Sequence, residues 1–332
     1  EPLAPLWFSQ ELVLQAFAER EYKHHFEGYQ DGLFFTILKG RQLGVSTFSQ
    51  AMIVHRLTTQ RNGKYLIASD VSTSSGNLFG ITELIYRNLP FYLKPASTKY
   101  ILSGETRTIA LDNESYVLMQ SGKAMRGQKV EESGEGKGEM GRSFTFTGYH
   151  LSELSAWENA EQIDGSLLPA VPIAPYTFGL EESTARGRYN WFHRRWLACE
   201  RRATPVHDIE GIFIPWYAEP EKWRLRPPVT WIPNEATLSH ARKCAEEGPR
   251  WMGKTVALTK DQLYWYERSR IAAEEEEDRK PGSLATFLTE YPATPEEAFQ
   301  FSGRSIFSLA VRERIKAQAR PIAAVMLVEP HA

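Results

Sequence analysis

The sequence has 332 residues, of which 42% are hydrophobic and 24% charged, with a formal net charge of −2. These values exclude a disordered chain and leave room for one to three globular domains. No apolar run approaches the roughly 18–20 residues of a membrane-spanning helix, and the near-zero charge excludes a uniformly basic nucleic-acid-binding surface but not a local basic patch. Cys199 and Cys244 have no histidines at zinc spacing, so we expect a reduced, cytoplasmic protein without disulfides or membrane contact.

Strands and helices are predicted to alternate from residue 33 to residue 182. Apolar runs predict strands at 34–39, 64–69, 107–111, 115–120, 144–151 and 176–181. Helices are predicted at 46–60, 76–88, 160–168 and 188–202. This alternation is typical of an α/β domain with a mainly parallel central sheet flanked by helices.

The composition changes after about residue 205. Prolines and tryptophans become frequent, and a further helix is predicted at about 260–280, with an acidic run at 274–278 that we interpret as a solvated face. We therefore divide the chain into a core at 1–204 and a smaller lid or linker subdomain at 205–332.

The first candidate site is a glycine-containing turn between a predicted strand and a predicted helix. It reads Lys39-Gly40-Arg41-Gln42-Leu43-Gly44-Val45-Ser46-Thr47. Strand, turn and helix in this order favour phosphate binding by backbone N–H groups and the helix N-terminus. The usual loop ends in Gly-Lys-Ser/Thr, whereas Val45 occupies the lysine position here. Either Lys39 or Arg41 supplies the missing charge, or the segment is only a tight connection.

The second candidate is the end of the strand predicted at 144–151, which continues into Ser152-Glu153. In P-loop ATPases an acidic pair at such a strand end organises Mg²⁺ and orients the attacking water. Glu153 lies where the base is expected. Ser152 occupies the aspartate position and is expected to be a weak magnesium partner, acting through water if at all. The alternative is a surface glutamate that caps the next helix.

The third candidate is Glu181-Glu182-Ser183-Thr184-Ala185-Arg186-Gly187, again at a predicted strand end. Hydroxyl residues at this place can sense the γ-phosphate and move the following helix. Ser183 and Thr184 are therefore candidate coupling residues, with a helix N-cap as the simpler interpretation.

Together these segments resemble the ATPase part of phage DNA-packaging terminase large subunits. The resemblance runs from about residue 34 to 307 and rests on the 41–47 loop, on His150-Leu151-Ser152-Glu153 and on the 183–187 segment. The most family-specific part is the 290–299 segment, which reads EYPATPEEAF, followed by Ser302-Gly303.

The resemblance implies a P-loop NTPase fold of the ASCE type, with ATP and Mg²⁺ as cofactors. It implies an arginine finger before the catalytic strand; Arg142 is the favoured candidate and Arg126 the competing one. The implied partners are double-stranded DNA, the portal protein and the small terminase subunit, with the chain acting as a homo-oligomeric ring on the portal and as a monomer in solution. The family's RNase H-like nuclease domain is not expected within these residues.

The sequence thus predicts an ATP-driven motor that moves double-stranded DNA into a procapsid at the portal, in the host bacterial cytoplasm. In this hypothesis Ser46 binds Mg²⁺, Glu153 positions water and Arg142 completes a neighbour's site. Six arginines between 186 and 202 form a candidate DNA-binding patch, with a solvated helix or subunit interface as the alternative. The rival functions are another P-loop translocase or helicase and an inactive module that bridges DNA, portal and small subunit.

Overall fold

The computed structural model describes residues 6–102, 106–121, 145–204, 206–248, 250–251 and 254–300. The candidate arginines Arg126 and Arg142, and the pair Ser302-Gly303, lie outside these residues.

The described part of the chain contains one large sheet and one two-stranded ribbon. The large sheet has the order β3-β4-β5-β2-β6-β7-β1-β8. Its strands are β1 (Leu33–Lys39), β2 (Lys64–Ser69), β3 (Ser97–Ile101), β4 (Arg107–Leu111), β5 (Tyr116–Ser121), β6 (Gly148–Ser152), β7 (Phe178–Ser183) and β8 (Glu210–Ile214). The ribbon pairs β9 (Arg250–Trp251) with β10 (Lys254–Thr255).

The α-helices of the described residues follow the same chain order. They are α1 (Phe8–Phe26), α2 (Val45–Thr59), α3 (Ser72–Arg87), α4 (Ala160–Leu167), α5 (Trp191–Glu200), α6 (Glu235–Glu247), α7 (Lys260–Glu277), α8 (Ser283–Glu290) and α9 (Pro295–Phe299). Short 3₁₀ turns include η3 (Leu154–Ala156) directly after β6 and η5 (Trp216–Ala218) after β8.

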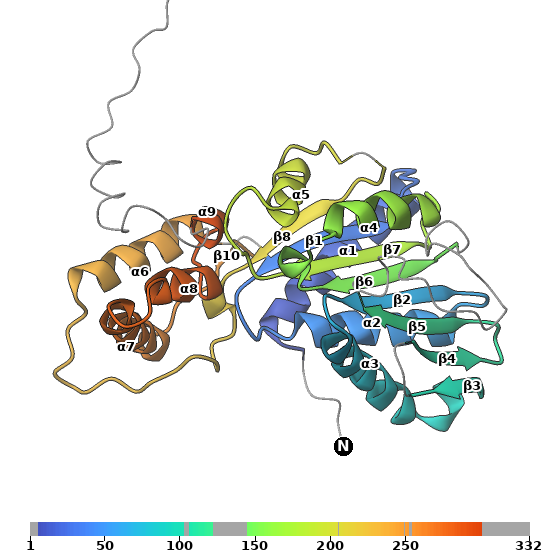
Figure 1. Ribbon diagram of the computed structural model, residues 1–332, viewed down its shortest axis with the longest axis horizontal. Helices are drawn as coiled ribbons and strands as arrows, with labels where there is room; N and C mark the ends of the chain where they lie inside the picture. The colour runs from blue at the N-terminus through green and yellow to red at the C-terminus, as the bar shows by residue number, and fades with distance from the viewer. Residues whose placement is uncertain are drawn as a thin grey trace, which may run out of the picture.

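The sheet is covered by helices on both faces because successive strand residues point to opposite sides. Phe35, Ile37 and Ile67 belong to an apolar cluster with residues of α1, α2 and α3. Phe34 and Leu38 belong to a second cluster with residues of α4 and α5. Figure 1 shows α4 and α5 together over one side of the sheet and α2 and α3 over the other. Strands buried on both faces are typical of parallel α/β sheets.

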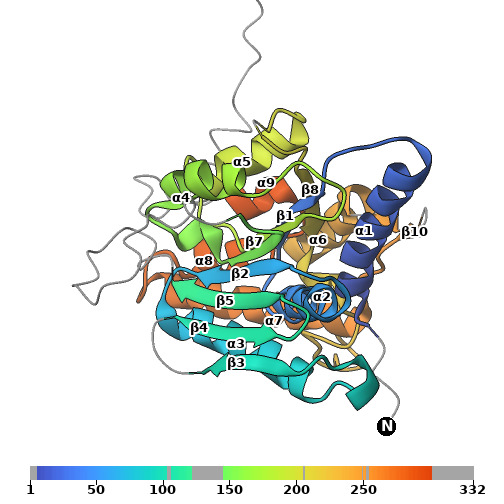
Figure 2. The ribbon, with the colours of Figure 1, turned by 90° about the vertical axis from the view of Figure 1, so that its right-hand side faces the viewer.

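The strand order identifies the class of fold. Strands β5, β2, β6, β7, β1 and β8 run parallel, while β4 and β3 add an antiparallel edge away from β8 (Figure 2). Strand β7 lies between β1, which precedes the phosphate-type loop, and β6, which precedes Glu153. An additional strand between these two is the ASCE arrangement, and the expected fold class is confirmed. The carboxyl ends of β1, β6 and β7 meet at one edge, where parallel α/β sheets bind their ligands.

The boundary between the two parts of the chain lies later than the composition indicated. The division at residue 205 assigned β8 to the smaller part, whereas β8 pairs with β1 through residues 210–214. The sheet domain therefore extends to Ile214. Helices α6 to α9 then form a separate group beside it (Figure 1), with a core of aromatic side chains that includes Trp216, Tyr266 and Phe287.

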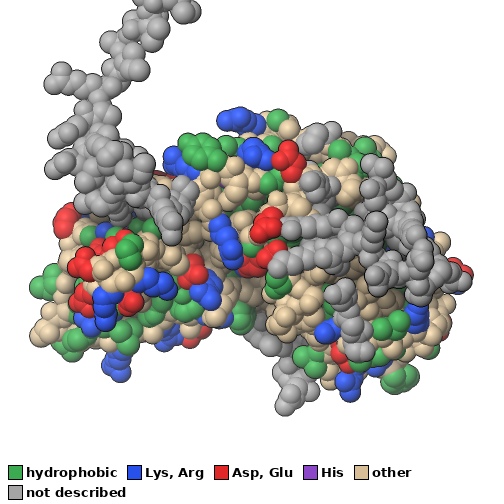
Figure 3. Space-filling view, viewed as in Figure 1, with side chains coloured by type: hydrophobic (Ala, Val, Ile, Leu, Met, Phe, Trp, Pro, Cys, Tyr) green, Lys and Arg blue, Asp and Glu red, His purple; other side chains and the backbone are tan. Residues whose placement is uncertain are grey.

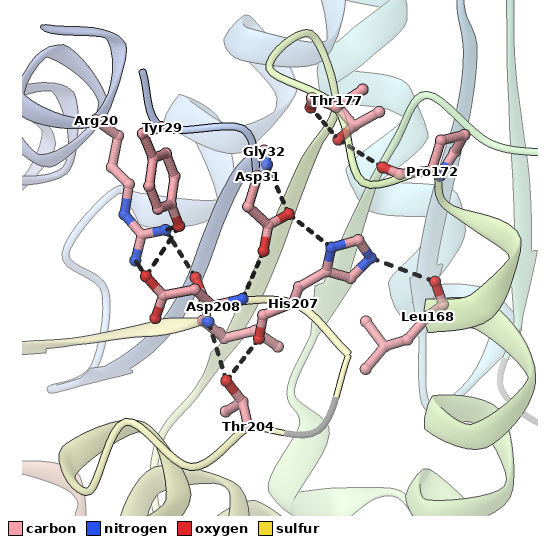
Figure 4. A network of polar contacts seen from close by, with 12 residues as sticks. Arg20, Tyr29, Asp31, Gly32, Leu168, Pro172, Thr177, Thr204, His207 and Asp208 are labelled. Atoms are coloured by element: carbon pink, nitrogen blue, oxygen red, sulfur yellow. Dashed lines mark hydrogen bonds and ion pairs between the residues drawn. The ribbon is translucent and has the colours of Figure 1, made fainter. Parts of the chain in front are cut away.

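A polar network holds β8 and α1 to the sheet at the amino end of β1 (Figure 4). Asp31 accepts hydrogen bonds from the backbone N–H groups of Gly32, at 2.7 Å, and Asp208, at 2.6 Å, and pairs with His207 at 2.9 Å. Arg20 of α1 lies 3.4 Å from the Asp208 carboxylate. Because these contacts span residues 20 to 208, helix α1 and strand β8 are integral to the domain, although neither was predicted from the sequence.

Candidate nucleotide site

The turn after β1 has the backbone shape of a phosphate-binding loop. Gly44 adopts a left-handed conformation at φ 73° and caps α2, which begins at Val45. Gly40 lies against the backbone of Trp216, so that a Cβ placed on it would be 2.8 Å from the Trp216 Cα. Both positions therefore favour glycine, the first for its backbone angles and the second for close approach. The loop leads directly into a helix N-terminus, whose first N–H groups have no partners within the helix.

Three consecutive carbonyl groups of the loop accept hydrogen bonds from side chains outside it. Lys222 Nζ donates to Gln42 O at 2.9 Å, Ser9 Oγ to Leu43 O at 2.6 Å and Gln10 Nε2 to Gly44 O at 3.1 Å. In a trans peptide the C=O and the following N–H point in opposite directions. These contacts therefore turn the N–H groups of residues 43–45 away from the three donors, as an anion-binding loop requires.

The structure also shows where the residue at the usual lysine position lies. Val45 is 1% exposed and belongs to the apolar cluster that contains Val13 and Phe17 of α1. It contributes to the core rather than to the charge of the site. Thr47, two residues later, is exposed on α2.

The two candidate cations are in different environments. The buried Lys39 ends β1 and places its Nζ 3.2 Å from Glu182 Oε2 and 3.7 Å from Glu153 Oε1. Burial alone would lower its pKa, but these two carboxylates outweigh that effect and raise it, so Lys39 is charged. Arg41 instead pairs with Glu290 at 2.8 Å, with 51% of its side chain exposed. The structure thus joins Lys39, and not Arg41, to the acidic residues of the site.

Glu182 is the centre of the polar contacts at this edge of the sheet. It is fully buried at the end of β7 and is paired in register with Ser152 of β6. Its Oε1 accepts hydrogen bonds from Ser46 Oγ at 2.5 Å and Ser152 Oγ at 2.9 Å. Burial disfavours a charged Glu182, but Lys39, His150 and Ser46 together hold its pKa well below the usual range. A buried, ionised carboxylate is therefore stabilised beside the loop.

Glu182 was not among the candidate residues predicted from the sequence. The predicted strand ended at Glu181, and of the residues that follow it only the hydroxyl residues Ser183 and Thr184 were considered as functional. The structure separates the pair because side chains alternate along a strand. Glu182 faces the loop, whereas Glu181 contacts Thr36 at 2.9 Å, Tyr149 at 3.2 Å and Arg195 at 3.3 Å.

Glu153 combines an unusual backbone conformation with a perturbed carboxyl group. Its backbone is left-handed at φ 57°, an unfavourable conformation for a non-glycine residue, and its side chain is 39% exposed. Burial of the carboxyl group raises its pKa against the opposing effect of Lys39, and the nearby Glu182 raises it further. A raised pKa makes Glu153 a stronger base than an ordinary carboxylate.

The predicted coupling residues connect the acidic site to neighbouring turns. Ser183 Oγ accepts a hydrogen bond from Ser155 N at 3.1 Å, in the turn that follows Glu153, and lies 2.7 Å from Thr184 O. From Thr184 the chain passes through Gly187, at φ 77°, to α5. Residues 183 and 184 thus lie between the acidic site and a helix on the sheet's surface.

The 290–299 segment contacts the loop, the turn η5 that follows β8, and α5. Glu290 accepts a hydrogen bond from the Arg41 backbone at 3.1 Å as well as from its side chain. Trp216 N donates to Pro292 O at 3.3 Å, and Phe299 packs on His193 of α5 with ring centres 4.6 Å apart. The segment is therefore a bridge between the loop and α5.

The arginines between 186 and 202 do not form one uniform patch. Arg195 is buried and pairs with Glu181, while the exposed Arg194 pairs with Glu161 at 2.8 Å. The others are exposed and comprise Arg186, Arg188, Arg201 and Arg202. Figure 3 shows positive and negative side chains next to one another where the helical group meets the sheet domain.

Within the described residues, no three His, Cys, Asp or Glu side chains are grouped as a metal site. Mg²⁺ in nucleotide sites does not require such a group, because phosphates and waters supply most of its ligands beside one or two protein oxygens. Ser46 Oγ and Glu182 Oε1, 2.5 Å apart, are oxygen donors of the required type. The residues present therefore fit a nucleotide-bound Mg²⁺.

No helix in the described ranges combines the length and the apolar character needed to cross a membrane. No protein-family model matches the sequence, and neither does any curated protein.

Solved structures of similar shape were found. The large terminase ATPase domain of Thermus phage P74-26 is 14% identical, with 82% of this chain and 92% of that chain covered and a TM-score of 0.45. The large terminase of bacteriophage HK97 is 11% identical, with coverages of 84% and 50% and a TM-score of 0.49. The large terminase of a thermophilic bacteriophage, in complex with ATP-gamma-S, is 10% identical, with coverages of 70% and 48% and a TM-score of 0.42.

The chain spans about half the length of the HK97 protein and of the ATP-gamma-S-bound terminase. These solved structures of similar shape are large terminases of phages, the family that the motifs in the sequence resemble.

Proposed function

We propose that this chain is an ATP-hydrolysing motor domain that translocates double-stranded DNA into a phage procapsid. The observation that carries the ATPase part is the convergence of Lys39, Ser46, Glu153 and Glu182 where β1, β6 and β7 end beside a glycine loop. Phosphoryl transfer requires a phosphate cradle, compensating cations and a residue that orients water. All three kinds of group are present within this one site.

The residues divide these tasks as follows. The loop at 40–46 cradles the phosphates through the backbone N–H groups that follow Arg41, since those of Gly40 and Arg41 already donate to Ile214 O and Glu290 O. The Lys39 ammonium supplies the positive charge that Val45 lacks. Ser46 binds Mg²⁺, which supplies charge stabilisation to the phosphates. Glu153 orients and deprotonates the attacking water. Arg142, outside the described residues, is proposed to reach the site of a neighbouring subunit in a ring.

The coupling of hydrolysis to movement uses two connections to α5. One runs from Glu153 through Ser155 and Ser183 to the chain that enters α5. The other runs from Arg41 through the 290–299 segment to Phe299, which packs on α5. Changes at the phosphates would therefore reach the same helix from two sides, next to the exposed arginines. We propose that these arginines contact DNA phosphates in a sequence-independent, salt-dependent way.

The alternative is a catalytically weak or inactive P-loop module that bridges DNA, the portal protein and the small terminase subunit. Val45 and Ser152 favour it, because each replaces a group that P-loop ATPases use. The positions of Lys39 and Glu182 favour catalysis. Lys39 brings a positive charge to the acidic residues of the site, and Glu182 brings a carboxylate into contact with Ser152. Another P-loop translocase or helicase is the remaining alternative.

ATP turnover with and without double-stranded DNA tests the proposal. We expect wild-type protein to hydrolyse ATP, faster with DNA, and Glu153→Gln to bind ATP normally but turn it over about 10²–10⁴-fold more slowly, the usual contribution of a general base. The matched control is Glu235→Gln, because Glu235 is an exposed glutamate of α6 paired with Arg242 and lies outside the proposed site. Absence of turnover in wild type at high protein concentration with DNA would favour the inactive module.

The same assay addresses Arg142. Arg142→Ala is expected to bind ATP but to lose turnover, and addition of a Glu153→Gln subunit with an intact Arg142 is expected to restore part of it if the arginine acts between subunits. Unchanged turnover in Arg142→Ala would reject this assignment.

A further inference from the structure

Strand β6 lacks the metal-organising carboxylate that P-loop ATPases place at its end, because Ser152 occupies that position. The neighbouring parallel strand supplies a carboxylate at the same level. Ser152 and Glu182 are paired in register, and their side chains meet through a hydrogen bond of 2.9 Å. A carboxylate on Glu182 therefore reaches the space that a residue at position 152 would otherwise serve.

The groups around Glu182 correspond to those of a cation site. Its Oε1 lies 2.5 Å from the hydroxyl of Ser46, the residue at the Mg²⁺-binding position of the loop, and its Oε2 lies 3.2 Å from the Lys39 ammonium. A positively charged group is thus already held against a fully buried carboxylate. The Ser46 hydroxyl supports a cation site independently of Lys39, because an ion pair between Lys39 and Glu182 alone would not require a hydroxyl oxygen beside the carboxylate.

His150 orients this carboxylate. Gln50 Nε2 lies 2.6 Å from His150 Nδ1, and Gln50 Oε1 accepts from Thr82 Oγ1 at 2.8 Å. When the Gln50 amide nitrogen donates to Nδ1, the ring proton is on Nε2, which lies 3.4 Å from Glu182 Oε1. A buried chain of polar groups from α3 through α2 therefore holds the His150 ring, and its Nε2 faces the Glu182 carboxylate.

We propose that Glu182 replaces the missing strand-end aspartate and, together with Ser46, holds the Mg²⁺ of the bound nucleotide. This inference rests on the proposed nucleotide-binding function. Before the metal binds, Lys39 neutralises Glu182. With Mg²⁺ held by Glu182 and Ser46, the Lys39 ammonium would be available to the phosphates. His150 is a positioning residue that holds the carboxylate toward the metal.

The test measures metal dependence of binding rather than turnover. The affinity for ATP-gamma-S is determined by calorimetry with Mg²⁺ and with EDTA, and Mn²⁺ bound in the presence of ATP-gamma-S is counted from the loss of the free-ion electron paramagnetic resonance signal. We expect Mg²⁺ to tighten binding by wild type at least tenfold. In Glu182→Gln this factor falls to near one and Mn²⁺ binding is lost, while affinity in EDTA is retained or increased because a negative charge beside the phosphates is removed.

Two further variants make the test specific. Glu181→Gln changes the adjacent buried glutamate, which faces away from the loop, and is expected to keep the wild-type Mg²⁺ factor. The double variant Ser152→Asp/Glu182→Gln returns a carboxylate to the paired position on β6 and is expected to recover most of the Mg²⁺ factor. Recovery would also show that the loss in Glu182→Gln is not a failure to fold.

The outcomes separate this inference from the function on which it rests. Wild-type protein that binds no ATP-gamma-S would overturn the proposed function and the inference with it. If Mg²⁺ tightens ATP-gamma-S binding by the same factor in wild type and in Glu182→Gln, the inference alone is overturned. If the Mg²⁺ factor is lost in Glu182→Gln and the double variant does not recover it, the claim that Glu182 replaces the strand-end aspartate is overturned.

Discussion

Replacing Lys39 by methionine is expected to destabilise the protein strongly. Methionine keeps the length of the side chain but removes the charge that faces Glu182, which is fully buried. Removing one partner of a buried ion pair typically costs about 3–5 kcal/mol because the remaining charge is left uncompensated. Ser46, Ser152 and His150 still donate to or face the carboxylate. We therefore expect a cost near the lower end, about 3 kcal/mol.

The assay is unfolding by denaturant at pH 7, with the free energy extrapolated to water. Arg41→Met is the matched control, because its ion pair with Glu290 is solvent-accessible: the Arg41 side chain is 51% exposed and the Glu290 side chain 30%. An exposed pair contributes about 0–1 kcal/mol, so this variant should be close to wild type. Adding Glu182→Gln to Lys39→Met should recover stability by removing the unpaired charge.

The pH dependence gives an independent check on the same pair. Folding lowers the pKa of Glu182 from its ordinary value of 4.5. Its contribution to stability is therefore complete above pH 4.5 and is lost as the pH falls toward the lowered pKa. Without Lys39 the pKa is lowered less, so the difference between wild type and Lys39→Met should narrow below pH 4.5. A Lys39→Met protein within about 1 kcal/mol of wild type at pH 7, the range of an exposed pair, would refute this account.

The remaining predictions concern the loop. Lys39→Met is expected to weaken ATP-gamma-S binding at least tenfold, whereas Arg41→Met, which breaks only the contact with Glu290, should change it less than threefold. Calorimetry on both variants measures the two affinities. A larger loss in Arg41→Met than in Lys39→Met would assign the phosphate-binding charge to Arg41. Gly40→Ala should weaken binding at least tenfold, because the new Cβ would approach Trp216 Cα to 2.8 Å and displace the loop. Gly80→Ala, a helical position with no atom within 4 Å of the added Cβ, should leave binding unchanged and raise the unfolding free energy by about 0.5–1 kcal/mol. Equal effects of the two alanine variants on binding would contradict the close approach at Gly40.

Local sequence patterns predicted the repeating elements of the fold but not their contacts. The predicted strands at 64–69 and 107–111 match β2 and β4, and the loop after β1 leads into α2 as expected. Helix α1 was missed because its apolar residues do not gather on one face: Val13 and Phe17 are buried, whereas Leu14 and Phe26 are exposed. Strand β8 was missed because it is short and follows a composition change that indicated a new domain.

The site was predictable only in part for the same reason. Residues 39–47, 152–153 and 183–184 were identified because each lies at the end of an apolar run. The choice between Lys39 and Arg41 could not be made, since it depends on Glu290, 249 residues away from Arg41. The role of Glu182 depends on the β6–β7 register, which pairs it with Ser152 and is a property of the folded sheet. Arg142 stays a prediction.

The most direct test of the central claim is the structure of this protein bound to Mg²⁺ and ATP-gamma-S. We predict that Lys39 Nζ lies within hydrogen-bonding distance of a β- or γ-phosphate oxygen, while Arg41 remains paired with Glu290. A structure in which Arg41 has left Glu290 for the phosphates, and Lys39 still pairs with Glu182 and Glu153, would contradict the assignment of Lys39 as the phosphate-binding cation.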